Sequence, residues 1–204
     1  MQEAAERISS KAHVFWPTLT LVYGLDFITK RLVEEYIRPA YVPHQIVGDL
    51  IRFTLAYNKD AAMGLSLGGY SRVGFTLTAT AVLIVLGVLY RRTPPGERSS
   101  VLALALITAG ALGNLTDRLL SSRGVVDFID VGIGTSRFYT FNVADSAVFC
   151  GAILLAIVSL KAEKKEKADA KMDSSNSDPV SGDSFDPRLS AAAGENADSL
   201  ERER

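Results

Sequence analysis

Four apolar segments dominate the sequence, and their length is the feature that most limits what the chain can fold into. A helix of roughly 20 apolar residues crosses the hydrocarbon core of a bilayer, which is about 30 Å thick. The first segment is the least apolar, because it contains Asp26, Lys30 and Arg31. The four predicted spans are residues 14–33, 74–90, 100–120 and 138–160. The sequence therefore predicts an all-α membrane protein with four transmembrane helices.

The segments outside the spans differ in composition. Residues 161–204 contain 8 Lys and Arg and 11 Asp and Glu, whereas residues 1–160 contain nearly all the large apolar side chains. A segment so poor in apolar residues cannot bury enough surface to offset its ordering entropy. We therefore expect residues 161–204 to be a polar tail that is disordered after a short charged helical run. Residues 1–13 form a short segment before the first span.

The basic residues predict how the spans are oriented. Loops that carry an excess of Lys and Arg stay on the cytoplasmic side of a membrane. Such residues precede the first span, separate the second from the third, and follow the fourth. They are Arg7, Lys11, Arg91, Arg92, Arg98, Lys161, Lys164, Lys165 and Lys167. With four spans these three segments share one side, so both termini are predicted to be cytoplasmic.

The two remaining loops, residues 34–73 and 121–137, then lie on the outer side. Within the first loop, IRFTLAYN (51–58) alternates Phe53, Leu55 and Tyr57 with smaller or polar side chains. This alternation is typical of a half-buried strand. The second loop contains VVDFIDVGIG, which is a suitable pairing partner. We expect a small β element on the outer membrane face.

Carboxylate and amide side chains lie near the outer ends of three predicted spans. They are Asp26, Asn114, Asp117, Asn142 and Asp145. At 1.5 Å per residue, the deepest of them sit roughly 10 Å below the outer surface. Asn114 and Asp117 form one i, i+3 pair, and Asn142 and Asp145 form another, so each pair shares a helix face. Because ionisable residues in spans usually face the bundle interior, the sequence predicts a polar pocket that opens outward, with Asn58 and Asp127 at its rim.

Two carboxylates that are brought together share a proton, because both do not easily ionise. One can act as a base toward water while the other donates a proton, which is aspartic-protease chemistry. The only histidines are His13 and His44, and carboxylates without histidine do not favour a zinc site. The alternative is a proton-coupled carrier, which also uses intramembrane carboxylates. A carrier needs polar groups through the full bilayer depth, whereas the inner halves of the last three spans are apolar.

Several of these residues also have purely structural interpretations. Asp145 is either catalytic or a partner for Arg118, and Asp130 competes with Asp127 as the loop carboxylate. Asp117 and Arg118 fit a structural ion pair that orients the site. Asp26 either belongs to the site or only pairs with Lys30 at i+4. Asn58 is a turn residue or a contact for the substrate backbone.

Five short motifs resemble, in order and spacing, those of the lipoprotein signal peptidases, also called type II or prolipoprotein signal peptidases. They are LDFITK (25–30), NKDAAMG (58–64), GNLTDRL (113–119), GVVDFID (124–130) and FNVADSA (141–147). The resemblance covers about residues 14–160. It implies four transmembrane helices with cytoplasmic termini, a small extracytoplasmic β-cradle, and a mobile loop that carries a helix and acts as a lid.

The resemblance also implies an activity and its residues. Members of this family cleave the signal peptide of a bacterial prolipoprotein just before its diacylglyceryl-modified cysteine. The catalytic aspartates fall on Asp127 and Asp145. The supporting residues fall on Asp26, Asn58, Asn114, Asp117, Arg118 and Asn142. The expected partners are the prolipoprotein, membrane lipids and the cyclic peptide inhibitor globomycin, with no metal, organic cofactor or nucleic acid. The expected location is the bacterial cytoplasmic (inner) membrane, with the site near its outer face.

Overall fold

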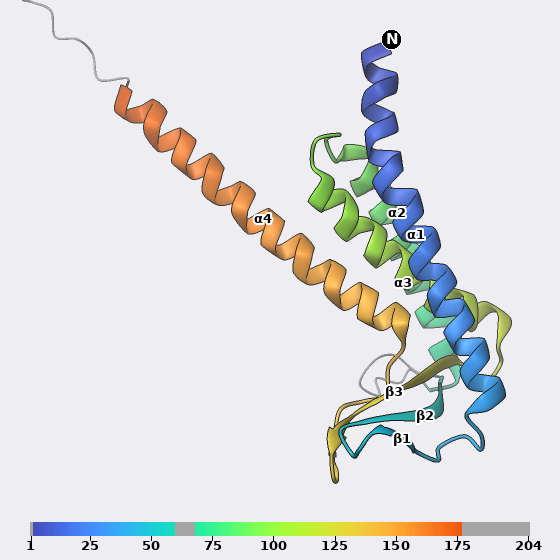
Figure 1. Ribbon diagram of the computed structural model, residues 1–204. Helices are drawn as coiled ribbons and strands as arrows, with labels where there is room; N and C mark the ends of the chain where they lie inside the picture. Colours follow the sequence, from blue (N-terminus) through green and yellow to red (C-terminus); the bar gives the residue numbers. More distant parts are fainter. Residues whose placement is uncertain (1, 60–67, 177–204) are drawn as a thin grey trace, which may run out of the picture. The chain divides into compact units, whose positions relative to one another are not determined.

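The computed structural model describes residues 2–59 and 68–176. Residues 1–162 form one compact unit, and the chain from Glu163 onward forms a second. The described elements are α1 (Gln2–Tyr36), β1 (His44–Val47), β2 (Ile51–Asn58), the 3₁₀ helix η2 (Gly68–Tyr70), α2 (Ser71–Arg92), α3 (Arg98–Leu120), β3 (Val125–Ile133), β4 (Ser136–Arg137) and α4 (Val143–Asn176) (Figure 1). The molecule is therefore mostly helical, with a small antiparallel sheet.

Three of the helices are long and apolar enough to cross a membrane. Within the described ranges these are α2, α3 and the Val143–Met172 part of α4. Helix α1 covers the first predicted span, but polar residues such as Asp26 keep its hydropathy below that of the others. The prediction of a membrane protein thus agrees with the structure, and three of the four predicted spans meet the requirement for length and apolar composition.

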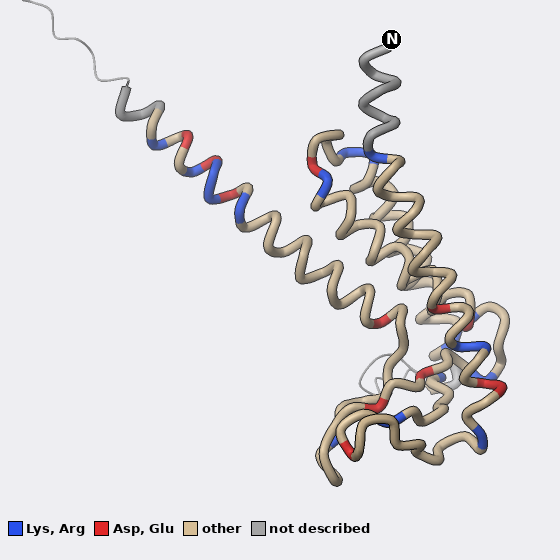
Figure 2. Tube along the Cα trace, in the orientation of Figure 1, with Lys and Arg blue, Asp and Glu red and all other residues tan. Residues whose placement is uncertain are grey.

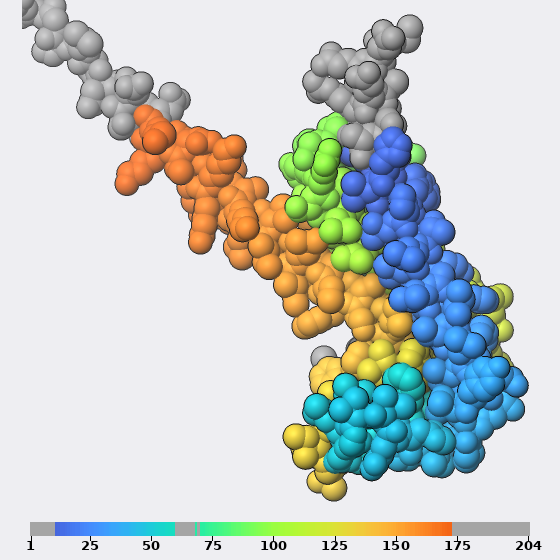
Figure 3. Space-filling view, viewed as in Figure 1, coloured from blue at the N-terminus to red at the C-terminus, as the bar shows by residue number. Residues whose placement is uncertain are grey.

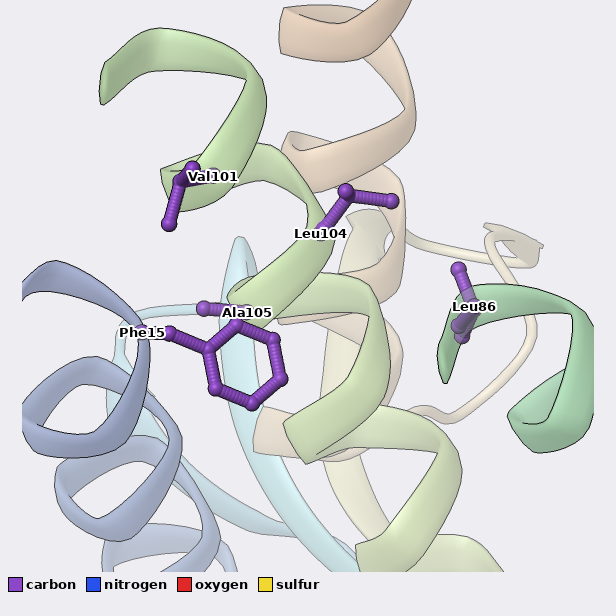
Figure 4. Close-up of a cluster of buried hydrophobic side chains, with 5 residues drawn as sticks. All are labelled: Phe15, Leu86, Val101, Leu104 and Ala105. Atoms are coloured by element: carbon purple, nitrogen blue, oxygen red, sulfur yellow. The ribbon is translucent and has the colours of Figure 1, made fainter. Parts of the chain in front are cut away.

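A buried apolar cluster holds α1, α2 and α3 together at the end that is remote from the sheet. Its members are Phe15, Leu86, Val101, Leu104 and Ala105 (Figure 4). Beside the cluster, the Lys11 ammonium donates to the carbonyl oxygens of Thr93 at 2.8 Å and Tyr90 at 3.2 Å. Because the last carbonyls of a helix have no partner within the helix, Lys11 of α1 caps the carboxyl end of α2.

The sheet has the order β1-β2-β3-β4, and every neighbouring pair is antiparallel. Strand β2 coincides with the predicted strand 51–58, and it pairs with the second loop through β3, as the sequence predicted. Leu55, Val126 and Phe128 are buried in a cluster with Val33 of α1. The sheet is thereby fixed to the carboxyl end of α1, and the surface of β1 and β2 lies at that end of the molecule (Figure 3).

Helix α4 begins at Val143, five residues after the start of the fourth predicted span at Phe138. The carbonyl oxygen of Phe141 accepts hydrogen bonds from the N–H groups of Phe128 and Ile129, and Phe141 forms a β-bridge with Ile129. This pairing keeps the chain extended up to Asn142. The predicted span 138–160 places Asp145 seven residues after the start of a helix, and this is wrong, because Asp145 is in the first turn of α4.

Two other predictions fall partly outside the described residues. Most of the expected lid, including Asp60 and Met63, lies in residues 60–67, and the described part of that loop ends in η2 before α2. In the tail, α4 continues to Asn176, with an ion pair of 2.5 Å between Lys167 and Glu163. The expected charged helical run is thus present, and residues 177–204 are outside the described ranges.

Glycines let α3 approach α1 and α4 closely. A Cβ atom at Gly113 would overlap Oδ2 of Asp26 and touch the side chain of Ala144. A Cβ atom at Gly110 would overlap the carbonyl oxygen of Ala144. Asp26 has no room to retreat, because it is buried and bonded to two other groups, as described below. The contact between these three helices therefore requires glycine at position 113.

We predict that Gly113→Ala destabilises the protein by about 1–3 kcal/mol, because the new methyl group overpacks the contact and displaces the Asp26 carboxylate. Thermal unfolding of the purified protein in detergent measures this loss. The matched control is Gly87→Ala in α2, where an added Cβ meets no atom within 4 Å. The control should gain up to about 1 kcal/mol from helix propensity. Equal stability of Gly113→Ala and wild type would contradict the packing described here.

Candidate active site

Asp145 is held at the amino end of α4 by a reciprocal cap. The side-chain Oδ1 of Asn142 accepts the N–H of Asp145 at 2.9 Å, and Oδ2 of Asp145 accepts the backbone N–H of Asn142 at 3.2 Å. This arrangement follows the capping box, with an aspartate at the third helical position. The first turn of a helix also favours a negative charge. The i, i+3 spacing of these two residues therefore reflects a helix start rather than a shared face within a span.

Asn114 of α3 provides a further hydrogen bond to Asp145. Its Nδ2 donates to Oδ1 of Asp145 at 2.8 Å. Its Oδ1 accepts from Nδ2 of Asn142 at 3.1 Å and from the Lys30 ammonium at 3.0 Å. Both oxygens of Asp145 thus accept hydrogen bonds, and the amide of Asn114 connects α1, α3 and α4.

Asp127 lies on β3 and faces the same side chains. Its exposed fraction is only 3%. Oδ1 accepts from Nδ2 of Asn142 at 2.8 Å, and Oδ2 accepts from Nδ2 of Asn58 at 3.1 Å. The two amide hydrogens of Asn142 are also within reach of Asn114 Oδ1 and of the Val126 carbonyl, and the contact with Asp127 is the shortest of the three. Asn142 therefore joins the two carboxylates.

The protonation of Asp127 is strongly influenced by its surroundings. Burial raises the pKa of the Asp127 carboxyl to about 7, and the charge of Asp145 adds to this increase. The hydrogen bonds from Asn58 and Asn142 act in the opposite direction, because they stabilise the ionised form. A carboxyl group that stays protonated near neutral pH beside a second carboxylate is able to donate a proton.

The position of Asn58 depends on a glycine. Gly124 precedes β3 with a φ of +104°, and a Cβ atom there would overlap the carbonyl oxygen of Asn58. Asn58 and Val125 are paired in the sheet, and Ala56 is paired with Asp127. Because side chains alternate along a strand, Asn58 and Asp127 project from the same face of the sheet. The glycine in GVVDF thus allows β3 to approach Asn58.

A buried ionic cluster lies behind these residues. The Lys30 ammonium is 2.8 Å from Oδ2 of Asp26 and 2.9 Å from Oδ2 of Asp117. Oδ1 of Asp26 accepts the N–H of Ala144 at 2.8 Å, in the first turn of α4. The expected i+4 pair of Asp26 and Lys30 is present, and Asp26 also contacts the site by holding α4. The pairing of Asp26 with Lys30 is thus confirmed, and its role in the site stays a prediction.

Asp117 and Arg118 do not behave as the structural ion pair that the sequence suggested. Asp117 pairs with Lys30 and with Arg31, the latter at 3.1 Å. Nη1 of Arg118 donates to the carbonyl oxygen of Asn114 at 3.2 Å, and its guanidinium lies over the ring of Phe75 at 6.0 Å. Consecutive residues on a helix point about 100° apart, so the two side chains have different partners.

Asp130, the rival of Asp127, has structural partners. Nε of Arg137 donates to its Oδ1 at 2.6 Å, and the Thr54 hydroxyl donates to its Oδ2 at 3.0 Å. These bonds connect β2, β3 and β4. The structure thus joins Asp127, rather than Asp130, to Asn58 and Asn142.

The structure brings the predicted residues into one connected group. Asp127, Asp145, Asn58, Asn114 and Asn142 are joined by hydrogen bonds between their side chains. Asp26 and Asp117 reach this group through Lys30 and through backbone N–H groups. Sequence reasoning missed Lys30 as a member of the cluster. The sequence signal for this role was a lysine within an apolar segment, four residues after Asp26.

Comparisons with known proteins agree with this arrangement. Residues 18–161 match the family model described as signal peptidase (SPase) II. A lipoprotein signal peptidase from Streptomyces coelicolor is 37% identical over 165 residues, covering 78% of this chain and 76% of that protein. One from Pseudomonas aeruginosa is 38% identical over 157 residues, covering 75% of this chain and 90% of that protein.

A solved structure is also similar. It is titled as a bacterial membrane enzyme structure obtained by the in meso method at 2.3 Å resolution. Its TM-score is 0.64 at 29% sequence identity, with 72% of this chain and 88% of that chain covered. The sequence matches, the apolar helices and the shared fold together show that the chain belongs to the signal peptidase II family and is a membrane protein of the peptidase class.

Proposed function

We propose that this protein removes the signal peptide from bacterial prolipoproteins by cleaving before the diacylglyceryl-modified cysteine, with Asp127 and Asp145 as its catalytic pair. The observation that carries the proposal is that Asn142 contacts both carboxylates, which come from separate elements: its side-chain Nδ2 donates to Asp127, and its backbone N–H donates to Asp145. Such a pair is suited to hydrolysis by an activated water. No metal or organic cofactor is needed for this chemistry.

The surroundings of the two carboxylates support different roles for them. Asp145 accepts hydrogen bonds from Asn114 and from the Asn142 backbone at the amino end of α4, and this fixes both of its oxygens in a position to accept a proton from water. Asp127 is buried, with its pKa raised to about 7, which favours its protonated form. In the resting pair Asp145 is therefore the base and Asp127 is the acid.

The reaction then proceeds in two proton-balanced steps. Asp145 takes a proton from water as the water oxygen bonds to the scissile carbonyl carbon, and Asp127 gives its proton to the carbonyl oxygen. In the second step Asp145 gives its new proton to the leaving nitrogen as the C–N bond breaks, and Asp127 recovers a proton from the intermediate. Asn58, Asn114 and Asn142 hold the two carboxylates in position. Asn58 and Arg118 are the proposed contacts for the substrate backbone.

In the proposed membrane arrangement α1 crosses the membrane as well as α2, α3 and α4, which gives four spans. A charged residue in a membrane helix is tolerated when its charge is matched inside the protein. Asp26 and Lys30 are each 1% exposed and pair with each other, which supports α1 as a span despite its polarity. Both termini lie on the cytoplasmic side, and the sheet and the site lie near the outer face of the bacterial cytoplasmic (inner) membrane.

The carrier alternative has less support. Along α1, α2 and α3, Lys, Arg, Asp and Glu gather toward the helix ends, and the middle of these helices is free of them (Figure 2). A carrier would need such groups through the bilayer depth. A site at one end is better suited to a substrate that is anchored in the membrane by its lipid, at about 0.8 kcal/mol per buried methylene. The same pocket is the proposed site for globomycin.

We predict that Asp127→Asn and Asp145→Asn each lower cleavage of a diacylated prolipoprotein by about 10³-fold or more, because each removes one member of an acid–base pair. Asparagine nearly preserves the shape of aspartate, so both variants should still fold. Cleavage by purified protein in detergent measures the effect, and a thermal unfolding scan of each variant confirms that it is folded.

The matched control is Asp130→Asn, which removes a carboxylate three residues from Asp127 that is bonded to Arg137 and Thr54. It should lower stability and leave the cleavage rate within about tenfold of wild type. If either catalytic variant cleaved within a few-fold of wild type, or if Asp130→Asn were equally inactive, the assignment of the pair would be wrong.

We predict that the cleavage rate falls as the pH rises through about 7. The raised pKa of Asp127 means that it is protonated below about pH 7 and loses its proton above it. Because Asp127 must donate that proton, the rate should decline by about tenfold for each further pH unit. Initial rates between pH 5 and 9 test this, with recovery of activity on return to pH 6 as the control for unfolding. A rate that instead increases through pH 7 to a plateau would mean that Asp127 acts ionised.

A further inference from the structure

Lys30 is the largest of the fully buried side chains in the described structure, with an exposed fraction of 1%. An ammonium group has three hydrogens to donate and no acceptor. Lys30 has three acceptors within 3.0 Å: Oδ2 of Asp26, Oδ2 of Asp117 and Oδ1 of Asn114. The ammonium donates a hydrogen bond to Asn114 and forms ion pairs with Asp26 and Asp117, so groups on both α1 and α3 hold its position.

The contact with Asn114 determines which end of that amide faces Asp145. Because Lys30 only donates, it requires the oxygen of Asn114 to point toward it. The Nδ2 group of Asn114 must then point the other way, and it donates to Oδ1 of Asp145 at 2.8 Å. The amide oxygen and nitrogen are similar in shape, and Lys30 distinguishes them together with Nδ2 of Asn142, which donates to the same oxygen at 3.1 Å.

The contact with Asp117 reaches the other carboxylate. Oδ2 of Asp117 forms an ion pair with the Lys30 ammonium and accepts a hydrogen bond from the backbone N–H of Val126 at 3.2 Å. Val126 is completely buried and directly precedes Asp127 in β3. Lys30 and Asp117 thus fix the strand that carries Asp127 against the end of α3.

Lys30 also balances charge around the pair. The charged groups that surround the site come from four elements: Asp26, Lys30 and Arg31 from α1, Asp117 and Arg118 from α3, Asp127 from β3 and Asp145 from α4. Among the described residues of β2 the site contact is the uncharged Asn58. Lys30 is almost fully buried, whereas the side chain of Arg31 is 41% exposed, so the charge of Lys30 is the less screened of the two.

We propose that Lys30 is a positioning residue for cleavage: its ammonium orients the Asn114 amide as a donor to Asp145 and, with Asp117, fixes the strand that carries Asp127. This inference rests on the proposed function of the Asp127 and Asp145 pair. Lys30 does not contact either carboxylate group of the pair directly, and it acts through Asn114 and Asp117. A purely structural lysine would affect stability without altering the chemistry of the remaining folded enzyme.

The test compares Lys30→Met with wild type on a diacylated prolipoprotein peptide in detergent, from pH 5 to 9. We expect kcat to fall by about 100-fold or more with KM within a few-fold. The two catalytic carboxylates are displaced in this variant, whereas the contacts that bind the substrate are unchanged. We also expect the alkaline limb of the pH profile to move to higher pH. A positive charge that favours the ionised form of Asp127 has then been removed.

The matched control is Lys11→Met, which removes the other α1 lysine that bonds to a neighbouring helix. It should lower thermal stability and leave the pH profile and kcat unchanged. A second measurement tests the route of the effect. If Lys30 acts through Asn114, then Lys30→Met should cost much less in an Asn114→Ala background than in wild type.

If Lys30→Met does not fold, the double variant Asp26→Asn/Lys30→Met replaces it, because it leaves one fewer unpaired carboxylate. Three results would overturn the inference. A folded protein without Lys30 could keep its kcat and its alkaline limb, or the losses of activity from Lys30→Met and Asn114→Ala could simply multiply in the double variant. If neither variant without Lys30 folds, Lys30 is a folding residue only. If wild type itself does not cleave the peptide, the proposed function fails instead.

Discussion

The pairing of the buried Lys30 ammonium with the carboxylates of Asp26 and Asp117 determines how the carboxyl ends of α1 and α3 meet. Charges between apolar helices have no water to solvate them, so their partners must come from the protein itself. Asp26 extends this pairing to α4 through the N–H of Ala144, and Asp117 extends it to β3 through the N–H of Val126. The close approach that these bonds require explains why position 113 is a glycine.

This arrangement places two chemically identical carboxylates, those of Asp127 and Asp145, in different environments. Asp145 is at a helix start, where the cap and the helix dipole stabilise a negative charge. Asp127 is on a buried strand, where desolvation favours the protonated form. Asn142, at the junction of strand and helix, donates to Asp127 from its side chain and to Asp145 from its backbone N–H. In the proposed mechanism, the different roles of the two carboxylates therefore arise from the fold around them, before the substrate binds.

Much of this could be predicted from the sequence, and the exceptions have physical reasons. Apolar runs predicted the long helices, and the alternation in residues 51–58 predicted β2. The start of α4 was placed five residues too early, because Phe141 is as apolar as a span residue, and its pairing with Ile129 is a tertiary contact. The i+4 rule linked Lys30 to Asp26, but its contacts with Asp117 and Asn114 on α3 depend on how the helices pack.

The choice between Asp127 and Asp130 shows the same limit. Local pattern alone did not separate two aspartates three residues apart, and only the resemblance to a family favoured the first. In the structure they have different partners, because Arg137 and Thr54 bind Asp130 whereas Asn58 and Asn142 bind Asp127. Those partners are distant in sequence or on neighbouring strands, so the distinction arises only when the sheet forms.

The central claim is that Asp127 and Asp145 act as one unit, and the double variant Asp127→Asn/Asp145→Asn tests it most directly. Residual cleavage of a diacylated prolipoprotein by the double variant is compared with that of each single variant under the same conditions. If the pair acts as a unit, the second substitution has little left to remove, and all three variants should cleave at similar residual rates. A double variant whose loss equals the product of the two single losses would contradict the account, because the two carboxylates would then contribute independently.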